Sequence, residues 1–143
     1  MKPVNILLAD DSQADADLIH EALLENRFFA NFYHVADGEQ AMAFLRRESP
    51  YTDAVTPDIL LLDLNMPRKS GHEVLAEIKT DPDLCWLPVV ILTTSTANSD
   101  LIDTYTHHAN AFLTKPMDFN EFMGLIRSLG DFWLAAVKLP PHD

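Results

Sequence analysis

Five short apolar runs alternate along the chain with stretches whose apolar residues recur at helical spacing. The apolar runs cover residues 4–9, 32–36, 59–62, 88–92 and 111–114. The stretches of helical spacing are residues 13–25, a segment opened by Asp37-Gly38, residues 71–80, residues around 98–107 and a segment capped by Asp118. Short apolar runs predict buried strands, and the helical period predicts amphipathic helices packed on them.

This alternation predicts an α/β fold with a five-stranded parallel sheet and five helices. Right-handed crossovers between parallel strands place the helices on both faces of the sheet. We expect a flavodoxin-like, doubly wound sheet with the strand order 2-1-3-4-5, in which ligands bind in the crevice at the carboxyl ends of strands 1 and 3. Residues 1–143 are expected to form a single domain, because a chain of this length can bury a core of its own.

The predicted strands end in charged or hydroxyl side chains. Asp10 and Asp11 follow the first strand, Asp63 the third, Thr93 the fourth, and Lys115 the fifth. These side chains would converge at one edge of a parallel sheet. Clustered carboxylates repel one another unless a divalent cation neutralises them, and such an oxygen site suits Mg²⁺. An aspartate there could attack phosphorus to form an acyl phosphate, while a lysine and a hydroxyl bind the phosphoryl oxygens.

A simpler interpretation is that these polar residues only cap the helices that follow them. Each acid could cap its own helix, and Thr93 could cap the fourth. Capping needs a single acid, however, and does not require a matching lysine on another strand. The whole set therefore favours a binding site over separate caps.

Charge and composition narrow the classes of partner. The chain has 22 acidic and 10 basic residues, a formal net charge of −12 that repels nucleic acid and anionic lipid surfaces. Its single cysteine, Cys85, excludes an intramolecular disulfide, and we expect it to be partly buried beside Trp86. The six histidines show no ligand spacing and are expected at the surface or at helix ends. We see no signal segment and no apolar run long enough to cross a bilayer, so we expect a cytoplasmic location.

Four short motifs, in this order, resemble the receiver domain of two-component response regulators. They are Asp10-Asp11, the sequence Asp-Leu-Asn-Met-Pro at residues 63–67 with Gly71 after it, Leu92-Thr93-Thr94, and Thr114-Lys115-Pro116. The resemblance covers residues 4 to 130. It implies that Asp63 accepts a phosphoryl group from a histidine kinase, with Thr93 as the switch hydroxyl and Lys115 as the phosphate-binding ammonium. It also implies that Mg²⁺ is held by Asp11, Asp63 and the backbone carbonyl of Asn65, with Asp10 assisting through water.

The chain departs from the family at the switch aromatic, where Phe112 stands in place of the frequent tyrosine. A phenyl ring can still change its rotamer, but it cannot form a hydroxyl hydrogen bond, so packing is the only energy available to such a switch. The alternative is that Phe112 is an ordinary core residue of its strand.

A further apolar stretch, residues 131–143, follows the last predicted helix. It resembles the end of small stand-alone receivers that work with phytochrome-type photoreceptor kinases, and the long segment 46–57 is similar to theirs as well. We therefore expect a single-domain response regulator without an effector of its own. Phe132, Trp133 and Val137 would be costly to leave in water, so we expect a homodimer formed by the fourth helix, the fifth strand, the fifth helix and this extension. The alternative is a tail folded back over the chain's own fourth helix.

Two other classes of function compete with this hypothesis. A Mg²⁺-dependent aspartyl-phosphate phosphatase of the haloacid dehalogenase kind needs a second acid two residues after its nucleophile, where this chain has Asn65, and a cap domain. An interaction module that has lost phosphorylation would need neither the acceptor nor the acid pair, the hydroxyl and the lysine. We therefore expect no enzyme beyond Mg²⁺-dependent self-phosphorylation and autodephosphorylation.

Overall fold

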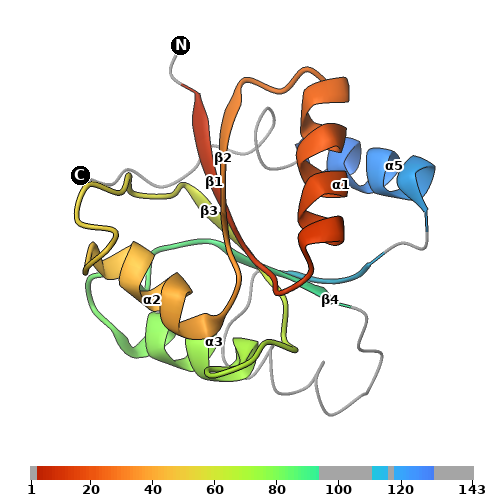
Figure 1. Cartoon of the computed structure of the whole chain (residues 1–143). Helices are drawn as coiled ribbons and strands as arrows, with labels where there is room; N and C mark the ends of the chain where they lie inside the picture. Colours follow the sequence, from red (N-terminus) through yellow and green to blue (C-terminus); the bar gives the residue numbers. More distant parts are fainter. Residues whose placement is uncertain (1–2, 94–110, 116–117, 131–143) are drawn as a thin grey trace.

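A five-stranded parallel sheet forms the centre of the computed structural model (Figure 1). The structure describes residues 3–93, 111–115 and 118–130, and it describes only the backbone of residues 93, 111, 112, 129 and 130. The strands are β1 (Val4–Ala9), β2 (Ala30–Val35), β3 (Ile59–Leu62), β4 (Val89–Thr93) and β5 (Ala111–Thr114). Their order is β2-β1-β3-β4-β5 and all four pairings are parallel. The predicted fold class and strand order are confirmed.

Helices cover both faces of the sheet, with α1 and α5 on one face and α2 and α3 on the other (Figure 1). These helices are α1 (Gln13–Glu25), α2 (Gly38–Arg46), α3 (Gly71–Thr80) and α5 (Phe119–Gly130). The helix expected around residues 98–107 and the extension 131–143 lie outside the described residues. None of the described helices is long and apolar enough to span a membrane.

The buried part of β1, Ile6 to Ala9, and the whole of β3 are apolar because both of their faces are covered. In β1, Leu7 and Ala9 pack toward α2 and α3, whereas Ile6 and Leu8 pack toward α1 and α5. The same alternation runs through the four residues of β3, all of which are buried. A strand covered on both faces has no polar positions to alternate with, which is why it appears in the sequence as an unbroken apolar run.

Side-chain caps mark the starts of the described helices. Ser12 Oγ accepts a hydrogen bond from the Asp15 backbone N–H (3.2 Å), and Asp118 Oδ1 accepts one from Glu121 N–H (2.9 Å). At α3 the cap is a complete capping box, in which Ser70 and the side chain of Glu73 bond each other's backbone N–H groups. These caps fix where each helix begins, and so they fix the length of each turn that follows a strand.

The sequence prediction for Cys85 was wrong, since its side chain is exposed. It lies in the turn after α3, where Leu84 and Leu87 are the buried members. Its Sγ lies 3.7 Å from the Pro82 carbonyl oxygen.

Close backbone packing requires a glycine at the start of α3. A Cβ added to Gly71 would lie 2.3 Å from the Asp63 carbonyl oxygen and 2.6 Å from Leu64 Cα. We predict that Gly71→Ala lowers the free energy of unfolding by about 1 to 3 kcal/mol, as overpacking does in well-packed sites. Gly124→Ala is the matched control, because an added Cβ there meets no atom within 4 Å. In the interior of α5 it should raise stability by up to about 1 kcal/mol. Urea denaturation measures both, and equal effects would contradict the packing argument.

Candidate functional site

The carboxyl ends of the strands bring four of the predicted residues to one edge of the sheet. Asp10 and Asp11 follow β1, Asp63 follows β3, and Lys115 follows β5. Thr93 is the last residue of β4, one position later than the strand end expected from the sequence, and it pairs with the last residue of β5. The side chains of Thr93 and Phe112 lie outside the described part of the structure.

The three aspartates form a compact group of oxygen donors. One carboxylate oxygen from each of Asp10, Asp11 and Asp63 lies within 4.8 Å of the others. Asp10 is fully buried and Asp63 is 5% exposed, whereas Asp11 is open to solvent. The group therefore has two buried carboxylates, Asp10 and Asp63, and one carboxylate at the surface, Asp11.

Asp10 is held in place by the turn after β1 and by the end of β2. Its Oδ1 accepts a hydrogen bond from Ser12 N–H (2.8 Å), and its backbone N–H donates to the Val35 carbonyl (3.0 Å). Its own carbonyl oxygen lies 2.7 Å from His34 Nε2. A carbonyl can only accept, so His34 Nε2 carries the hydrogen here. This role of His34 was not expected from the sequence.

Asp63 has both of its carboxylate oxygens engaged. Its Oδ1 accepts a hydrogen bond from Asn65 N–H (3.1 Å), and its Oδ2 lies 3.1 Å from Lys115 Nζ. The Asp63 backbone N–H donates to the Ala9 carbonyl (2.9 Å), which joins the end of β3 to the end of β1. One oxygen thus faces the loop after β3, and the other faces the lysine.

Lys115 is nearly buried and is surrounded by three carboxylates. Its Nζ lies 2.6 Å from Asp10 Oδ2, 2.9 Å from Asp15 Oδ2 and 3.1 Å from Asp63 Oδ2. Asp15, in the first turn of α1, is a contact that the sequence analysis missed.

A capping rule could have pointed to Asp15. It stands three residues after the cap Ser12, where an acid commonly bonds the backbone N–H of the cap residue. In α1 Asp10 Oδ1 takes that N–H, which leaves the carboxylate of Asp15 to pair with Lys115.

The pKa values of Asp10 and Lys115 are both raised, for different reasons. Burial raises the pKa of Asp10, and the hydrogen bonds and charge of Lys115 and Ser12 N–H offset only part of that effect. Burial alone would lower the pKa of Lys115, but its contacts with Asp10, Asp15 and Asp63 outweigh burial and raise it. Lys115 is therefore a cation at any physiological pH, facing an excess of carboxylates.

These residues fit a divalent cation. Asp10 Oδ2 is held only by its ion pair with Lys115, and it is the one buried side-chain nitrogen or oxygen among the described residues without a hydrogen bond of regular geometry. Carboxylate oxygens are the ligands preferred by hard cations such as Mg²⁺ and Mn²⁺. An acid group with few protein ligands, one of them exposed, can hold such an ion and leave positions for water.

The loop after Asp63 is fastened to α2 and α3. Arg68, whose φ is 67°, forms an ion pair with the buried carboxylate of Asp37. Burial alone would raise the pKa of Asp37, but the Gln40 backbone N–H and the Arg68 guanidinium outweigh it and lower the pKa. Asp37 thus caps α2 and anchors the loop at the same time.

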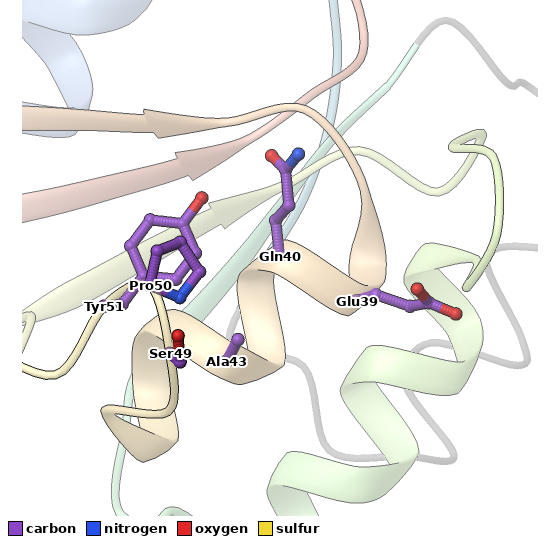
Figure 2. Close-up of a pocket in the computed structure, with 6 residues that line it drawn as sticks. All are labelled: Glu39, Gln40, Ala43, Ser49, Pro50 and Tyr51. Atoms are coloured by element: carbon purple, nitrogen blue, oxygen red, sulfur yellow. The ribbon is translucent and has the colours of Figure 1, made fainter.

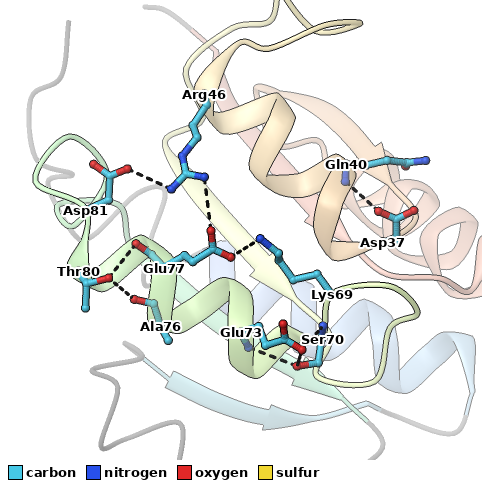
Figure 3. Close-up of polar contacts among 10 residues, drawn as sticks. All are labelled: Asp37, Gln40, Arg46, Lys69, Ser70, Glu73, Ala76, Glu77, Thr80 and Asp81. Carbon is cyan, nitrogen blue, oxygen red and sulfur yellow. Dashed lines mark hydrogen bonds and ion pairs between the residues drawn. The ribbon is translucent and has the colours of Figure 1, made fainter.

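A second set of ion pairs joins the same loop to α3, and α3 to α2 (Figure 3). Glu77 of α3 pairs with Lys69 of the loop and with Arg46 of α2. Arg46 also pairs with Asp81 (3.4 Å). These side chains are partly exposed, so we expect them to stabilise the loop position only weakly.

A hollow of about 320 Å³ lies between α2 and the connection that follows it (Figure 2). It is lined by Glu39, Gln40, Ala43, Ser49, Pro50 and Tyr51. Neither the aspartates of the candidate site nor Lys115 lines it, so it is separate from that site.

Comparison with known proteins gives consistent matches. The family model described as "Response regulator receiver domain" matches residues 6–127. Response regulator Rcp1 of Synechocystis sp. is 43% identical over 138 residues, which are 96% of this chain and 94% of Rcp1. A crystal structure of the Mn²⁺-bound form of Rcp1 covers 97% of this chain and 100% of its own, with a TM-score of 0.91 and 42% identity. A structure of the phosphorylated cyanobacterial phytochrome response regulator RcpA gives a TM-score of 0.92 at 42% identity, covering 97% and 99%.

Proposed function

Because the chain belongs to the response regulator receiver domain family, we propose that it accepts a phosphoryl group from a histidine kinase on Asp63. In this proposal it acts as a single-domain response regulator. One observation carries the proposal: Asp63 belongs to the acid cluster and also has Lys115 Nζ 3.1 Å from its Oδ2. A carboxylate that only capped a helix would not need a nearly buried lysine from another strand.

The proposed step is a transfer of one phosphoryl group. An oxygen of Asp63 forms a bond to phosphorus while the bond from phosphorus to the kinase histidine breaks, and the bonding electrons return to the imidazole nitrogen. Lys115 neutralises charge on the phosphoryl oxygens, and the backbone N–H of Asn65 orients the carboxylate. Hydrolysis of the acyl phosphate by water would return Asp63 to its free form.

We propose Mg²⁺ as the cation of the acid cluster, held by Asp11, Asp63 and the Asn65 carbonyl, with Asp10 assisting. When bound, the ion neutralises the carboxylates and the incoming phosphoryl oxygens. The Mn²⁺-bound form of the relative Rcp1 supports an ion of this class. Thr93 as switch hydroxyl and Phe112 as switch aromatic remain proposals of the same kind.

The proposed partner is a phytochrome-type histidine kinase acting in the cytoplasm. The support is the likeness to RcpA, which is described as a phytochrome response regulator. We also propose a homodimer that uses the fourth helix, the fifth strand, the fifth helix and residues 131–143. The support is the apolar sequence of that extension, and light scattering on the full chain measures the mass in solution.

Phosphotransfer is the direct test of the proposed function. The full chain is mixed with an autophosphorylated phytochrome-type kinase, and separately with a small acyl phosphate, with and without Mg²⁺. We expect the intact mass to rise by one phosphoryl group in both reactions, and only with Mg²⁺ present. Failure with the acyl phosphate would contradict the phosphoacceptor itself. Failure with the kinase alone would remove only that class of partner.

The same preparation separates the rival functions. Multiple turnover on a phosphomonoester would favour the aspartyl-phosphate phosphatase. No labelling, together with no Mg²⁺-dependent binding of beryllium fluoride, would favour an interaction module that does not use phosphorylation.

A further inference from the structure

Asp15 has a place in the site that neither the family likeness nor helix capping accounts for. We infer that Asp15 is a positioning residue: it holds the ammonium of Lys115 so that a divalent cation can take Asp10 and Asp63. This inference rests on the proposed cation site and adds a residue to it. Its basis is the 2.9 Å contact between Lys115 Nζ and Asp15 Oδ2, made from the first turn of α1 to the end of β5.

The ammonium and the cation compete for the same oxygens. Lys115 Nζ has three N–H donors, and three carboxylate oxygens lie within 3.1 Å of it. Asp10 and Asp63 also belong to the acid cluster that would hold the ion, whereas Asp15 does not. A cation that binds there competes with Lys115 for two of its three partners, for Asp63 directly and for Asp10 through water.

Asp15, the remaining partner of Lys115, sets how much free energy the protein loses when the cation replaces the ammonium at the other two carboxylates. The Lys115 side chain is only 4% exposed, so an ammonium left without a carboxylate would be expensive to bury. Asp15 keeps its contact with Lys115 after the exchange, because its carboxylate is not a ligand of the cluster. Without Asp15 the ammonium would have to stay on Asp10 and Asp63, and it would oppose the cation.

The local structure leaves Asp15 free for this role. Asp10 Oδ1 already occupies the backbone N–H of Ser12, the group that the acid of a capping box would bond. In α3 the corresponding acid, Glu73, does bond the backbone N–H of its cap residue, Ser70. The two helices therefore use the same position differently, and only in α1 does the acid reach the candidate site.

The test is Mg²⁺ affinity, measured by titration calorimetry on the full chain. Asp15→Asn should weaken Mg²⁺ binding by about three- to fivefold, the size expected of a partly exposed ion pair. Asp17→Asn is the matched control, because it removes the same charge from an exposed site two residues further along α1, where Asp17 pairs with Gln13. It should change the affinity by less than about 1.5-fold, as expected of a screened surface charge. Asp15→Glu should restore most of the loss.

A Lys115→Met background separates the proposed role of Asp15 from a general loss of negative charge. The ammonium that competes with the cation is gone there, so Asp15→Asn should weaken Mg²⁺ binding no more than Asp17→Asn does. A full loss in that background would overturn the inference. If Lys115→Met does not fold, the comparison of Asp15→Asn with Asp17→Asn and Asp15→Glu decides. Equal effects of Asp15→Asn and Asp17→Asn would overturn the role of Asp15 while the site stands, whereas no Mg²⁺ binding by the unmodified chain would overturn the proposed cation site and the inference together.

Discussion

Asp63→Asn should abolish labelling by both the kinase and a small acyl phosphate, and leave the fold intact. An amide oxygen cannot form the acyl phosphate, but it can still accept the hydrogen bond from Asn65 N–H and face Lys115 Nζ. The change also removes one of several clustered charges, so we expect the free energy of unfolding to stay the same or rise. Intact-mass measurement detects the label, and urea denaturation reports the stability.

Asp58→Asn is the matched control for this prediction. Asp58 precedes the opposite end of β3, where its Oδ2 accepts a hydrogen bond from Asn5 N–H (2.8 Å). Labelling should survive this change, because the site lies at the other end of the strand. Phosphoryl groups that remain on the Asp63→Asn chain, on Asp10 or Asp11 for example, would show that the acceptor was assigned wrongly.

The elements of the fold were predictable because each has a strong local signal. The apolar runs and the helical spacing predicted the bounds of β1, α1, β3 and β5 as the structure has them. The start of β2 was predicted two residues late. The polar Asn31 interrupts the apolar run there, and Ala30 and Asn31 join the strand because they pair with Val4 and Asn5 of β1. Such pairing between distant segments does not appear in a local pattern.

The candidate site was predictable in part for a related reason. Topology alone brings the ends of parallel strands together, so Asp10, Asp63 and Lys115 could be placed from their positions in the sequence. Asp15 and His34 could not, because their contacts depend on side-chain direction and register. His34 reaches the Asp10 carbonyl because β2 pairs with β1 in the register that sets His34 against Leu8.

Lys115→Met should lower the free energy of unfolding by about 3 to 4 kcal/mol at pH 7 without divalent cations. Removing one partner of a buried ion pair leaves an uncompensated charge, which costs about 3 to 5 kcal/mol. Protonation of Asp10 sets an upper limit to that cost. Neutralising a carboxyl with the ordinary pKa of 3.8 costs about 4 kcal/mol at pH 7.

The penalty of Lys115→Met should depend on pH in a definite direction. Lys115 lowers the pKa of Asp10, so its removal raises further a pKa that burial has already raised. A carboxyl whose pKa is raised in the folded state binds its proton more tightly there, so its contribution to stability falls as pH rises through that pKa. The penalty should therefore be largest near neutral pH and shrink toward zero as pH falls to about 4. Lys115 itself adds no slope there, because it is charged in the unfolded state at pH values well below its ordinary pKa of 10.5, and its pKa in the folded state is higher still.

Lys79→Met separates this charge effect from the loss of a lysine as such. Lys79 Nζ donates to the Leu87 carbonyl (2.7 Å) and the Cys85 carbonyl (3.4 Å), and burial lowers its pKa. Its replacement should cost about 1 kcal/mol, with no change between about pH 4 and 7 and no response to Mg²⁺. For Lys115→Met, added Mg²⁺ should narrow the difference from the unmodified chain, because a bound cation supplies positive charge to the same carboxylates. Urea denaturation across pH, with and without Mg²⁺, measures both variants. A penalty for Lys115→Met that stays constant with pH and Mg²⁺ would mean that Lys115 stabilises the fold by packing rather than by neutralising the acids.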